Sequence, residues 1–299
     1  MIHAESPHPR TDEITVATKV FTRTEAFRGL LESIPPYINH VIVADDGHTQ
    51  SRASIYNSSW DFELNVLDLE YDAGIGVGRD ALVDAFDTEF LLMTDPDHRI
   101  PPNAHILLEQ LIEVPEFGGI AGLLVEDGRV GGYCHDFRNE DGGNILVRCS
   151  NDTEVRRIAD YPLLEFNFVP QAALVRRDAL ADYSWDPYFQ SAKDHLDFMI
   201  GQWDAGWQWG ASPSVLFEHI ETTDEEYNKS RQDLVSWYKA KEHILNKWEY
   251  DQIVSKRNSA AFTDRSLKTA VTESIPVGIQ RWLNEAGDIK NLALGRYRA

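Results

Sequence analysis

Long apolar runs, cysteines and basic residues are all scarce in this 299-residue chain. No stretch of about 18 consecutive apolar residues occurs, so we expect no transmembrane segment. The opening residues, MIHAESPHPRTDE, lack the basic and apolar regions of a signal peptide and are expected to form a short tail. We therefore expect a cytoplasmic protein and leave peripheral contact with a membrane open.

The only two cysteines, Cys134 and Cys149, lie in a glycine-rich polar region. Two interpretations exist: thiols without a disulfide in a reducing cytoplasm, which we favour, or a pair that faces across a hairpin. No closely spaced cysteine pair suggests a zinc site.

Basic residues number 28 against 49 acidic ones, which gives a net charge of −21. This balance argues against nucleic acid as a partner, because phosphate backbones need a basic face. The acidic residues are spread along the chain instead of forming one tail. A dispersed acidic surface is typical of proteins that stay soluble in high salt, so we expect a halophilic source.

Along the first half of the chain, apolar segments typical of β-strands alternate with segments whose apolar residues have the spacing of an α-helix. Such alternation predicts βαβ units and an α/β fold with a mainly parallel central sheet flanked by helices. Glycine pairs at 131–132 and 142–143 predict a hairpin, and the chain becomes helical after about residue 224. We place a core domain at 12–222 and a helical C-terminal extension at 223–299. The expected strands are 13–21, 40–47, 64–72, 89–97, 118–126 and 165–177, and the expected helices are 22–34, 74–87 and 101–113.

Three of the expected strands end in acidic or glycine residues. These ends are Asp45-Asp46-Gly47, Asp72-Ala73-Gly74 and Asp95-Pro96-Asp97. Ligands of open parallel sheets bind beyond the carboxyl ends of the strands, so the three segments are expected to meet at one edge. This convergence points to a binding site more strongly than any one motif does.

Asp95 and Asp97 directly follow an apolar strand. Residues two apart in an extended chain project to the same side, and two carboxylates there suit Mg²⁺ or Mn²⁺. An EF-hand is excluded because position six of the loop would be Ile100 and position twelve Ile106. The alternative is a solvated loop in which Asp97 caps the following helix.

Two further segments carry candidate residues. The sequence GIGVGR at 74–79 lies between a strand and a helix, where glycines and a helix N-terminus favour phosphate, and Arg79 would pair with a diphosphate. The alternative is a tight glycine turn with Arg79 on the surface. Asp194, His195 and Asp197 cluster at an expected helix start and are candidates for a catalytic base, the alternative being helix capping.

These motifs in this order resemble inverting glycosyltransferases of the GT-A fold, the large family-2 group. The chain is particularly similar to the branch that includes β-1,4-N-acetylgalactosaminyltransferase-like enzymes and archaeal relatives. The resemblance covers residues 14–231. It rests on VIVADDG, GIGVGRDALV, FDTEFLLMTDPDHRI, WDPYFQSAKDHLDF and FEHI.

The resemblance implies a role for each candidate residue. The nucleotide base would be held by Thr18, Asp45 and Asp46, and the ribose and diphosphate by Gly78 and Arg79. Asp95 and Asp97 would hold the Mn²⁺ or Mg²⁺ ion that bridges the diphosphate, with Asp95 also touching the nucleotide-sugar and His219 completing the metal ligands. The general base would come from the KDHLDF segment: we favour Asp194, with His195 and Asp197 behind it, and the alternative is His195 if the base aligns to the second position of the acidic pair.

The resemblance also implies a nucleotide-sugar donor, expected to be a UDP-sugar, and a glycan or lipid-linked acceptor. Two departures affect this interpretation: the usual Glu-Asp pair is Asp194-His195 here, and the first loop reads ATKVFTRTE. The loops near 127–150 and 220–231 are candidate lids, with Tyr227 and Arg231 reaching the diphosphate. The alternatives are a sugar-phosphate nucleotidyltransferase and a non-catalytic module that binds a nucleotide-sugar or a metal.

Overall fold

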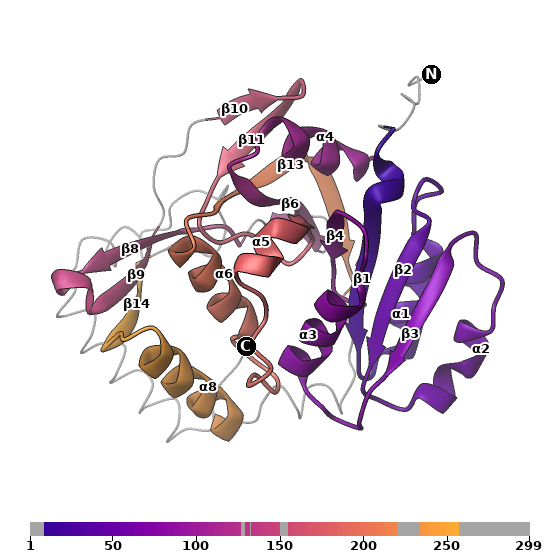
Figure 1. The fold of residues 1–299 in the computed structure, drawn as a ribbon, viewed down its shortest axis with the longest axis horizontal. Helices are drawn as coiled ribbons and strands as arrows, with labels where there is room; N and C mark the ends of the chain where they lie inside the picture. Colours follow the sequence, from indigo (N-terminus) through magenta and orange to yellow (C-terminus); the bar gives the residue numbers. More distant parts are fainter. Residues whose placement is uncertain (1–8, 127–128, 132, 150–154, 221–233, 257–299) are drawn as a thin grey trace.

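The computed structural model describes residues 9–126, 129–131, 133–149, 155–220 and 234–256, and a large sheet crosses its centre (Figure 1). The order of the main strands in this 11-stranded sheet is β10-β11-β13-β6-β12-β4-β1-β2-β3. Two short strands, β5 (His98–Arg99) and β7 (Arg129–Gly131), pair with β13 and β6. The others are β1 (Ile14–Val20), β2 (His40–Asp45), β3 (Glu63–Asp68), β4 (Phe90–Met93), β6 (Phe117–Glu126), β10 (Val155–Ile158), β11 (Tyr161–Glu165), β12 (Ala173–Arg176) and β13 (Gln208–His219).

The sheet is parallel on one side and mixed on the other. Strands β4, β1, β2 and β3 are all parallel neighbours, as the alternation of strands and helices predicts. Strand β12 is antiparallel to both β4 and β6, whereas β6 and β13 are parallel to each other. The expected strand 165–177 is wrong in extent, because β11 ends at Glu165 and β12 begins at Ala173. Pro170 lies between them and has no N–H for a ladder bond.

Helices cover both faces of the sheet because successive side chains of a strand point to opposite sides. In β4, Leu91 and Met93 belong to a core on the face of α3, α5 and α6, whereas Phe90 and Leu92 pack on the face of α1 and α4. The helices are α1 (Thr24–Glu32), α2 (Ala53–Tyr56), α3 (Ile75–Ala85), α4 (His105–Glu113), α5 (Arg177–Asp182), α6 (Asp194–Asp204) and α8 (Leu234–Lys247), with 3-10 turns at Thr11–Glu13, Thr49–Arg52 and Asp141–Gly143. None of the described helices combines the length and the apolar composition that a membrane span needs.

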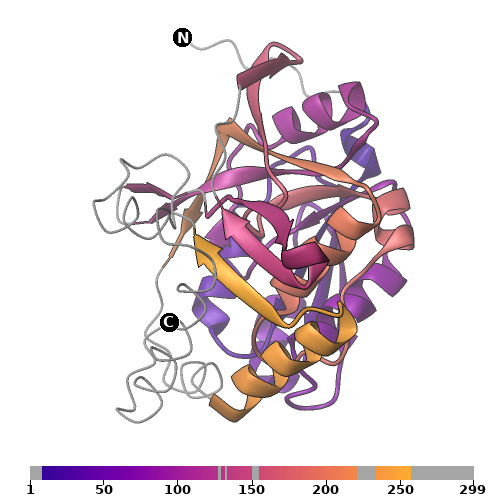
Figure 2. The same ribbon diagram turned by 90° about the vertical axis from the view of Figure 1, so that its left-hand side faces the viewer.

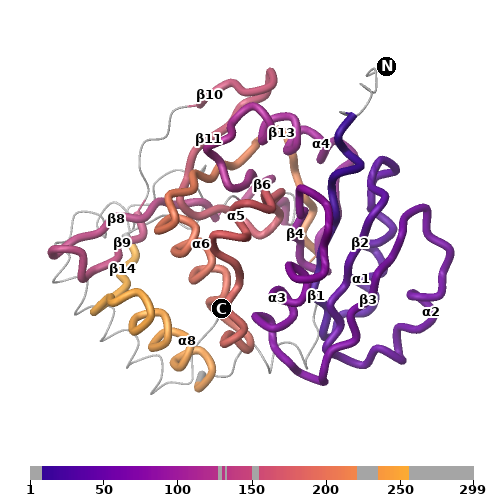
Figure 3. Tube along the Cα trace, in the orientation of Figure 1, coloured from indigo at the N-terminus to yellow at the C-terminus, as the bar shows by residue number. Residues whose placement is uncertain are grey.

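A second sheet of three strands lies beside α6 and α8 (Figure 2). The predicted hairpin is β8 (Asp136–Glu140) followed by β9 (Ile145–Cys149), and β14 (Gln252–Lys256) adds in parallel to β9. The Cα trace in Figure 3 shows that the chain, after α8, comes back to lie beside β9. The expected helix therefore stops at Lys247 and a strand follows. No disulfide joins Cys134 and Cys149, whose side chains are both buried.

The described part of the expected extension packs onto the large domain. Ala240 and Ile244 of α8 are buried in the same core as α3 and α6. Asp197 of α6 accepts hydrogen bonds from Lys247 and from Trp248, at 3.0 Å and 2.8 Å. Helix α8 is thus anchored by both apolar and charged contacts to the helix that carries the candidate base.

Candidate functional site

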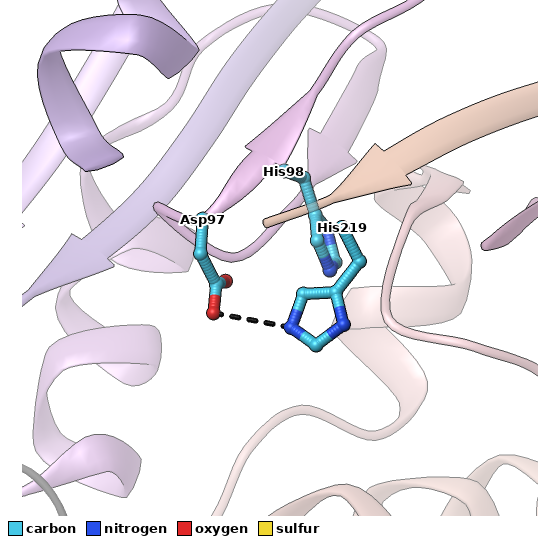
Figure 4. Close-up of side chains that lie close together, drawn as sticks. All are labelled: Asp97, His98 and His219. Carbon is cyan, nitrogen blue, oxygen red and sulfur yellow. Dashed lines mark hydrogen bonds and ion pairs between the residues drawn. The ribbon is translucent and has the colours of Figure 1, made fainter. Parts of the chain in front are cut away.

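Asp97, His98 and His219 meet where β4 ends and β13 ends (Figure 4). The antiparallel pair β5–β13 places His219 directly opposite His98, and the N–H of Ile220 donates to the carbonyl of Asp97 at 2.9 Å. One ligand atom from each of the three side chains lies within 4.8 Å of the others. Asp97 Oδ2 and His219 Nε2 are 3.2 Å apart. Strand pairing therefore joins residues 122 positions apart into one cluster.

This cluster fits a divalent transition ion. Burial lowers the pKa of His98 and so favours the neutral imidazole that a metal needs. His98 Nδ1 lies 2.9 Å from the Thr94 hydroxyl, which orients the ring. One carboxylate and two imidazoles suit Mn²⁺ better than Mg²⁺, which prefers an all-oxygen shell. The expected ligands Asp97 and His219 are thus brought together, His98 joins them, and Asp95 does not belong to the cluster.

Arg23 also reaches Asp97, through an ion pair with the same Oδ2 atom that faces His219. Burial alone would raise the pKa of Asp97, but the hydrogen bond from His219 and the charge of Arg23 lower it below the usual value. Arg23 has a left-handed backbone with φ of 58°, which is rare for a non-glycine residue and costs conformational energy. Asp97 does not cap α4, whose N-cap residue is Ala104, so the helix-cap alternative is wrong.

Arg79 connects the candidate metal loop to the candidate base. Its guanidinium donates to Asp95 Oδ1 at 2.9 Å and forms an ion pair with Asp194. Only 3% of the Arg79 side chain is exposed, so the surface alternative for this residue is wrong. Helix α3, the end of β4 and the start of α6 thereby converge on one buried cation.

The N-terminus of α3 is not open to a phosphate in this structure. The N–H groups of Ile75 and Gly76 donate to the carbonyls of Gln190 and Phe189, at 2.9 Å and 2.8 Å. A Cβ atom on Gly78 would lie 2.5 Å from Lys19 Cγ, so this glycine allows close packing of α3 on β1. The expectation of a phosphate cradle at 74–79 is therefore not met, because protein groups already occupy both the backbone donors and the space.

The three residues expected to hold a nucleotide base are all fully buried. Asp45 is held by Arg52 and by Tyr56, so its carboxylate ties α2 to the end of β2. Asp46 pairs with Lys19 at 2.7 Å and accepts the Gly74 N–H at 3.0 Å. Thr18 lies inside the sheet. Its hydroxyl oxygen is buried and has no hydrogen-bond partner among the described residues. The contacts of Asp45 and Asp46 favour structural roles for these two carboxylates.

An exposed aromatic group lies at the same edge instead. The rings of His48 and Tyr71 stack at 5.0 Å with an interplanar angle of 29°, and Phe21 lies 5.5 Å from Tyr71. Lys19 Nζ lies 5.2 Å from the Phe21 ring. More than half of Tyr71 is exposed. The three ring residues follow β1, β2 and β3, and the sequence offered no signal for them beyond their position after strands.

The three candidates for the base have different surroundings. Asp194 begins α6 and faces Arg79. His195 Nε2 contacts the Val169 carbonyl at 2.7 Å, and burial lowers the pKa of this histidine to about 4. Asp197 is fully buried and is bound by Tyr183, Lys247 and Trp248. Asp194 is therefore the member of the group that lies with the charged residues of the site.

Arg23 and His98 are site residues that sequence reasoning missed. His98 was detectable because it directly follows the D-x-D pattern, whereas Arg23 required knowledge of its contact with Asp97. Tyr227 and Arg231 lie outside the described residues.

No family model and no curated protein matches this chain. Among solved structures, GalNAc-T7, crystallised with UDP, GalNAc and Mn²⁺, is similar with a TM-score of 0.53 and 13% identity over 78% of this chain. The match spans about half of that protein, 49% of its chain. S. aureus TarS (residues 1–349) matches with a TM-score of 0.48 and 15% identity, over 78% of this chain and 64% of that one. The likeness to GalNAc-T7 establishes a GT-A-like glycosyltransferase fold.

Proposed function

We propose that this protein is a metal-dependent inverting glycosyltransferase of the family-2 type. It would move a sugar from a nucleoside-diphosphate sugar, a UDP-sugar, to a hydroxyl of a glycan or lipid-linked acceptor. The observation that carries the proposal is Arg79, which bridges Asp95 and Asp194 beside the cluster of Asp97, His98 and His219. In this arrangement a charged residue for the donor and a base for the acceptor share one edge of the sheet.

The donor half of the site uses positive charge. Asp97, His98 and His219 would hold Mn²⁺, which when bound supplies Lewis-acid stabilisation of several kcal/mol to a leaving diphosphate. Arg79 adds a buried cation on the same side. The exposed ring of Tyr71 offers a flat surface on which a nucleobase can stack, next to the β2 and β3 ends.

The acceptor half uses Asp194. Its carboxylate would take the proton of the acceptor hydroxyl as that oxygen attacks the anomeric carbon, while the bond to the diphosphate breaks. General-base assistance of this kind contributes about 10²–10⁴ to the rate. A single displacement needs one base and inverts the anomeric configuration, whereas retention by double displacement needs a nucleophile on the opposite face of the sugar as well. Arg79 would fix the orientation of Asp194 through their ion pair.

The proposed domains follow the same logic. All the residues assigned above lie within 12–222, which we propose as the catalytic domain, with 223–299 as an extension. Helix α8 would restrain the site, because Lys247 at its end and Trp248 just after it donate hydrogen bonds to Asp197. Asp197 lies three positions after the proposed base.

The test is calorimetric titration of UDP and of GDP, with Mn²⁺ and then with EDTA, into the wild-type protein and two variants. His219→Ala removes a proposed ligand, and His40→Ala removes a partly exposed imidazole at the start of β2, 41% exposed, as a matched control. We expect UDP binding that needs Mn²⁺ and that is lost in His219→Ala only.

Three other outcomes count against the proposal. Absence of binding for both nucleotides, with the fold intact by circular dichroism, would contradict it. Equal UDP binding in Mn²⁺ and in EDTA would show that nucleotide binding does not need a metal ion. Tight binding without transfer of sugar to any acceptor or to water would favour the non-catalytic module instead.

A further inference from the structure

His219 has a carboxylate beside each nitrogen of its ring. Nε2 lies 3.2 Å from Asp97 Oδ2, within the cluster proposed to hold the metal ion, and Nδ1 lies 3.1 Å from Glu126 Oε1. In Figure 4 the second nitrogen points away from Asp97. Glu126 is not a member of the cluster of Asp97, His98 and His219, so it contacts a proposed metal ligand from the side away from the ion.

Strand register brings Glu126 to His219. Strands β6 and β13 are parallel neighbours, and Val125 of β6 lies beside Glu218 of β13. One further step along both strands reaches Glu126 and His219, the last residue of each strand. Side chains at the same level of neighbouring strands point to the same face of a sheet. The contact between the two side chains therefore follows from the pairing of the strands.

The carboxylate of Glu126 is held by a second group. The hydroxyl of Tyr133 donates to Glu126 Oε2 at 3.2 Å, whereas Oε1 is the oxygen that faces His219. The side chains of Glu126 and His219 are 28% and 26% exposed, so water surrounds their contact only in part. The two oxygens of Glu126 thus have different partners, which restrains the carboxylate where it meets the imidazole.

This arrangement suits a metal-binding imidazole. A metal ion binds the lone pair of one ring nitrogen, and the other nitrogen of the neutral ring then carries the hydrogen. A carboxylate beside Nδ1 only accepts hydrogen bonds, so it favours the tautomer in which the lone pair is on Nε2, the nitrogen that faces Asp97. Partners of this kind typically change the affinity for the metal by about 10–100-fold.

We propose that Glu126 is a positioning residue for the metal ion. Its carboxylate accepts the hydrogen of His219 Nδ1 and so keeps Nε2 directed toward the ion and toward Asp97. The role of Glu126 toward an ion rests on the proposed function, whereas its pairing with His219 does not. The end of β6 would thereby support a metal site whose ligands come from β5, β13 and the loop before β5.

The first test is calorimetric titration of Mn²⁺ into the full chain without nucleotide. Glu126→Gln removes the charge at nearly constant size. Glu218→Gln removes the same charge from the exposed neighbour of His219, as a matched control for the loss of a negative charge near a cation. His219→Ala identifies the part of the signal that belongs to the cluster. We expect a Kd for Mn²⁺ about 10–100-fold higher in Glu126→Gln, with Glu218→Gln close to wild type.

The second test needs no metal. In protein with ¹⁵N-labelled histidine, kept in EDTA, the Nδ1 resonance of His219 is assigned by its loss in His219→Ala. We expect this resonance to move in Glu126→Gln and to stay in place in Glu218→Gln. The free energy of unfolding of Glu126→Gln should remain close to that of wild type, because a partly exposed pair contributes little to stability.

The outcomes separate this inference from the proposed function. Wild type that binds Mn²⁺ and UDP, with an unchanged Kd for Mn²⁺ in Glu126→Gln, would overturn the role of Glu126 and leave the glycosyltransferase intact. Equal weakening in Glu218→Gln would assign the effect to charge alone and also overturn it, as would an unmoved Nδ1 resonance. Absence of Mn²⁺ binding in wild type would contradict the metal site itself, and with it any role of Glu126 toward an ion.

Discussion

Arg23 and His219 meet the same oxygen of Asp97, one as a permanent cation and the other as an imidazole. Arg23 comes from the loop after β1, and its left-handed backbone directs it to the end of β4. A guanidinium beside a carboxylate competes with a metal ion for that oxygen. We therefore propose that a metal ion bound through this oxygen would displace Arg23 from Asp97 Oδ2.

Replacement of Arg23 by Gln is expected to tighten Mn²⁺ binding by about tenfold, because a competing unit charge near Asp97 is removed. Titration of Mn²⁺ into the nucleotide-free protein measures the change. Arg28→Gln, on the exposed side of α1, is the control and should leave the affinity unchanged. Unchanged or weaker Mn²⁺ binding in Arg23→Gln would show that the ion does not use this oxygen of Asp97.

Asp194→Asn is expected to lower the transfer rate by about 10²–10⁴, as for loss of a general base, because the amide cannot accept the proton. The dissociation constant of UDP with Mn²⁺ should change little, since the proposed role of Asp194 is toward the acceptor. Steady-state transfer from a UDP-sugar and titration of UDP give the two quantities. A variant with full transfer activity would show that another group takes the proton.

Asp197→Asn is expected to lower the free energy of unfolding by about 2–3 kcal/mol, because a fully buried carboxylate loses its charge next to Lys247 and Trp248. Urea denaturation followed by circular dichroism measures this loss. The control is Asp204→Asn, at the exposed end of the same helix. A stable Asp197→Asn protein with reduced transfer would instead assign this residue to the chemistry.

Asp186 makes stability depend on pH in the acidic range. Burial alone would raise its pKa, but hydrogen bonds from Lys247 and His243 lower it from 3.8 to about 2. A depressed pKa stabilises the folded state at pH above the unfolded value, and this contribution disappears as pH falls from about 4 to about 2. The difference in unfolding free energy between wild type and Asp186→Asn should shrink over that window. Asp61→Asn, at an exposed site, should show a constant difference, and a constant difference for Asp186→Asn would contradict the assignment.

The first half of the fold was predictable because its signals are local. Apolar runs such as Phe90–Met93 and the helical spacing of 101–113 depend only on neighbouring residues. Their alternation predicts that β4, β1, β2 and β3 run parallel, whereas the order of these strands comes from the structure. The break between β11 and β12 and the strand β14 were missed. Their formation depends on partners far along the chain, such as Ile145–Cys149 for β14.

The residue types of the site were predictable from local sequence: acids after strands, Arg79 after glycines and Asp194 at a helix start. Which of these residues meet depends on packing and strand pairing in the folded chain. Asp45 pairs with Arg52 and Asp46 pairs with Lys19, because both carboxylates are buried and a buried carboxylate needs a partner. The pairing of β5 with β13 placed His219 beside Asp97 and His98, since contacts between distant segments come from packing and strand register, which local patterns do not specify.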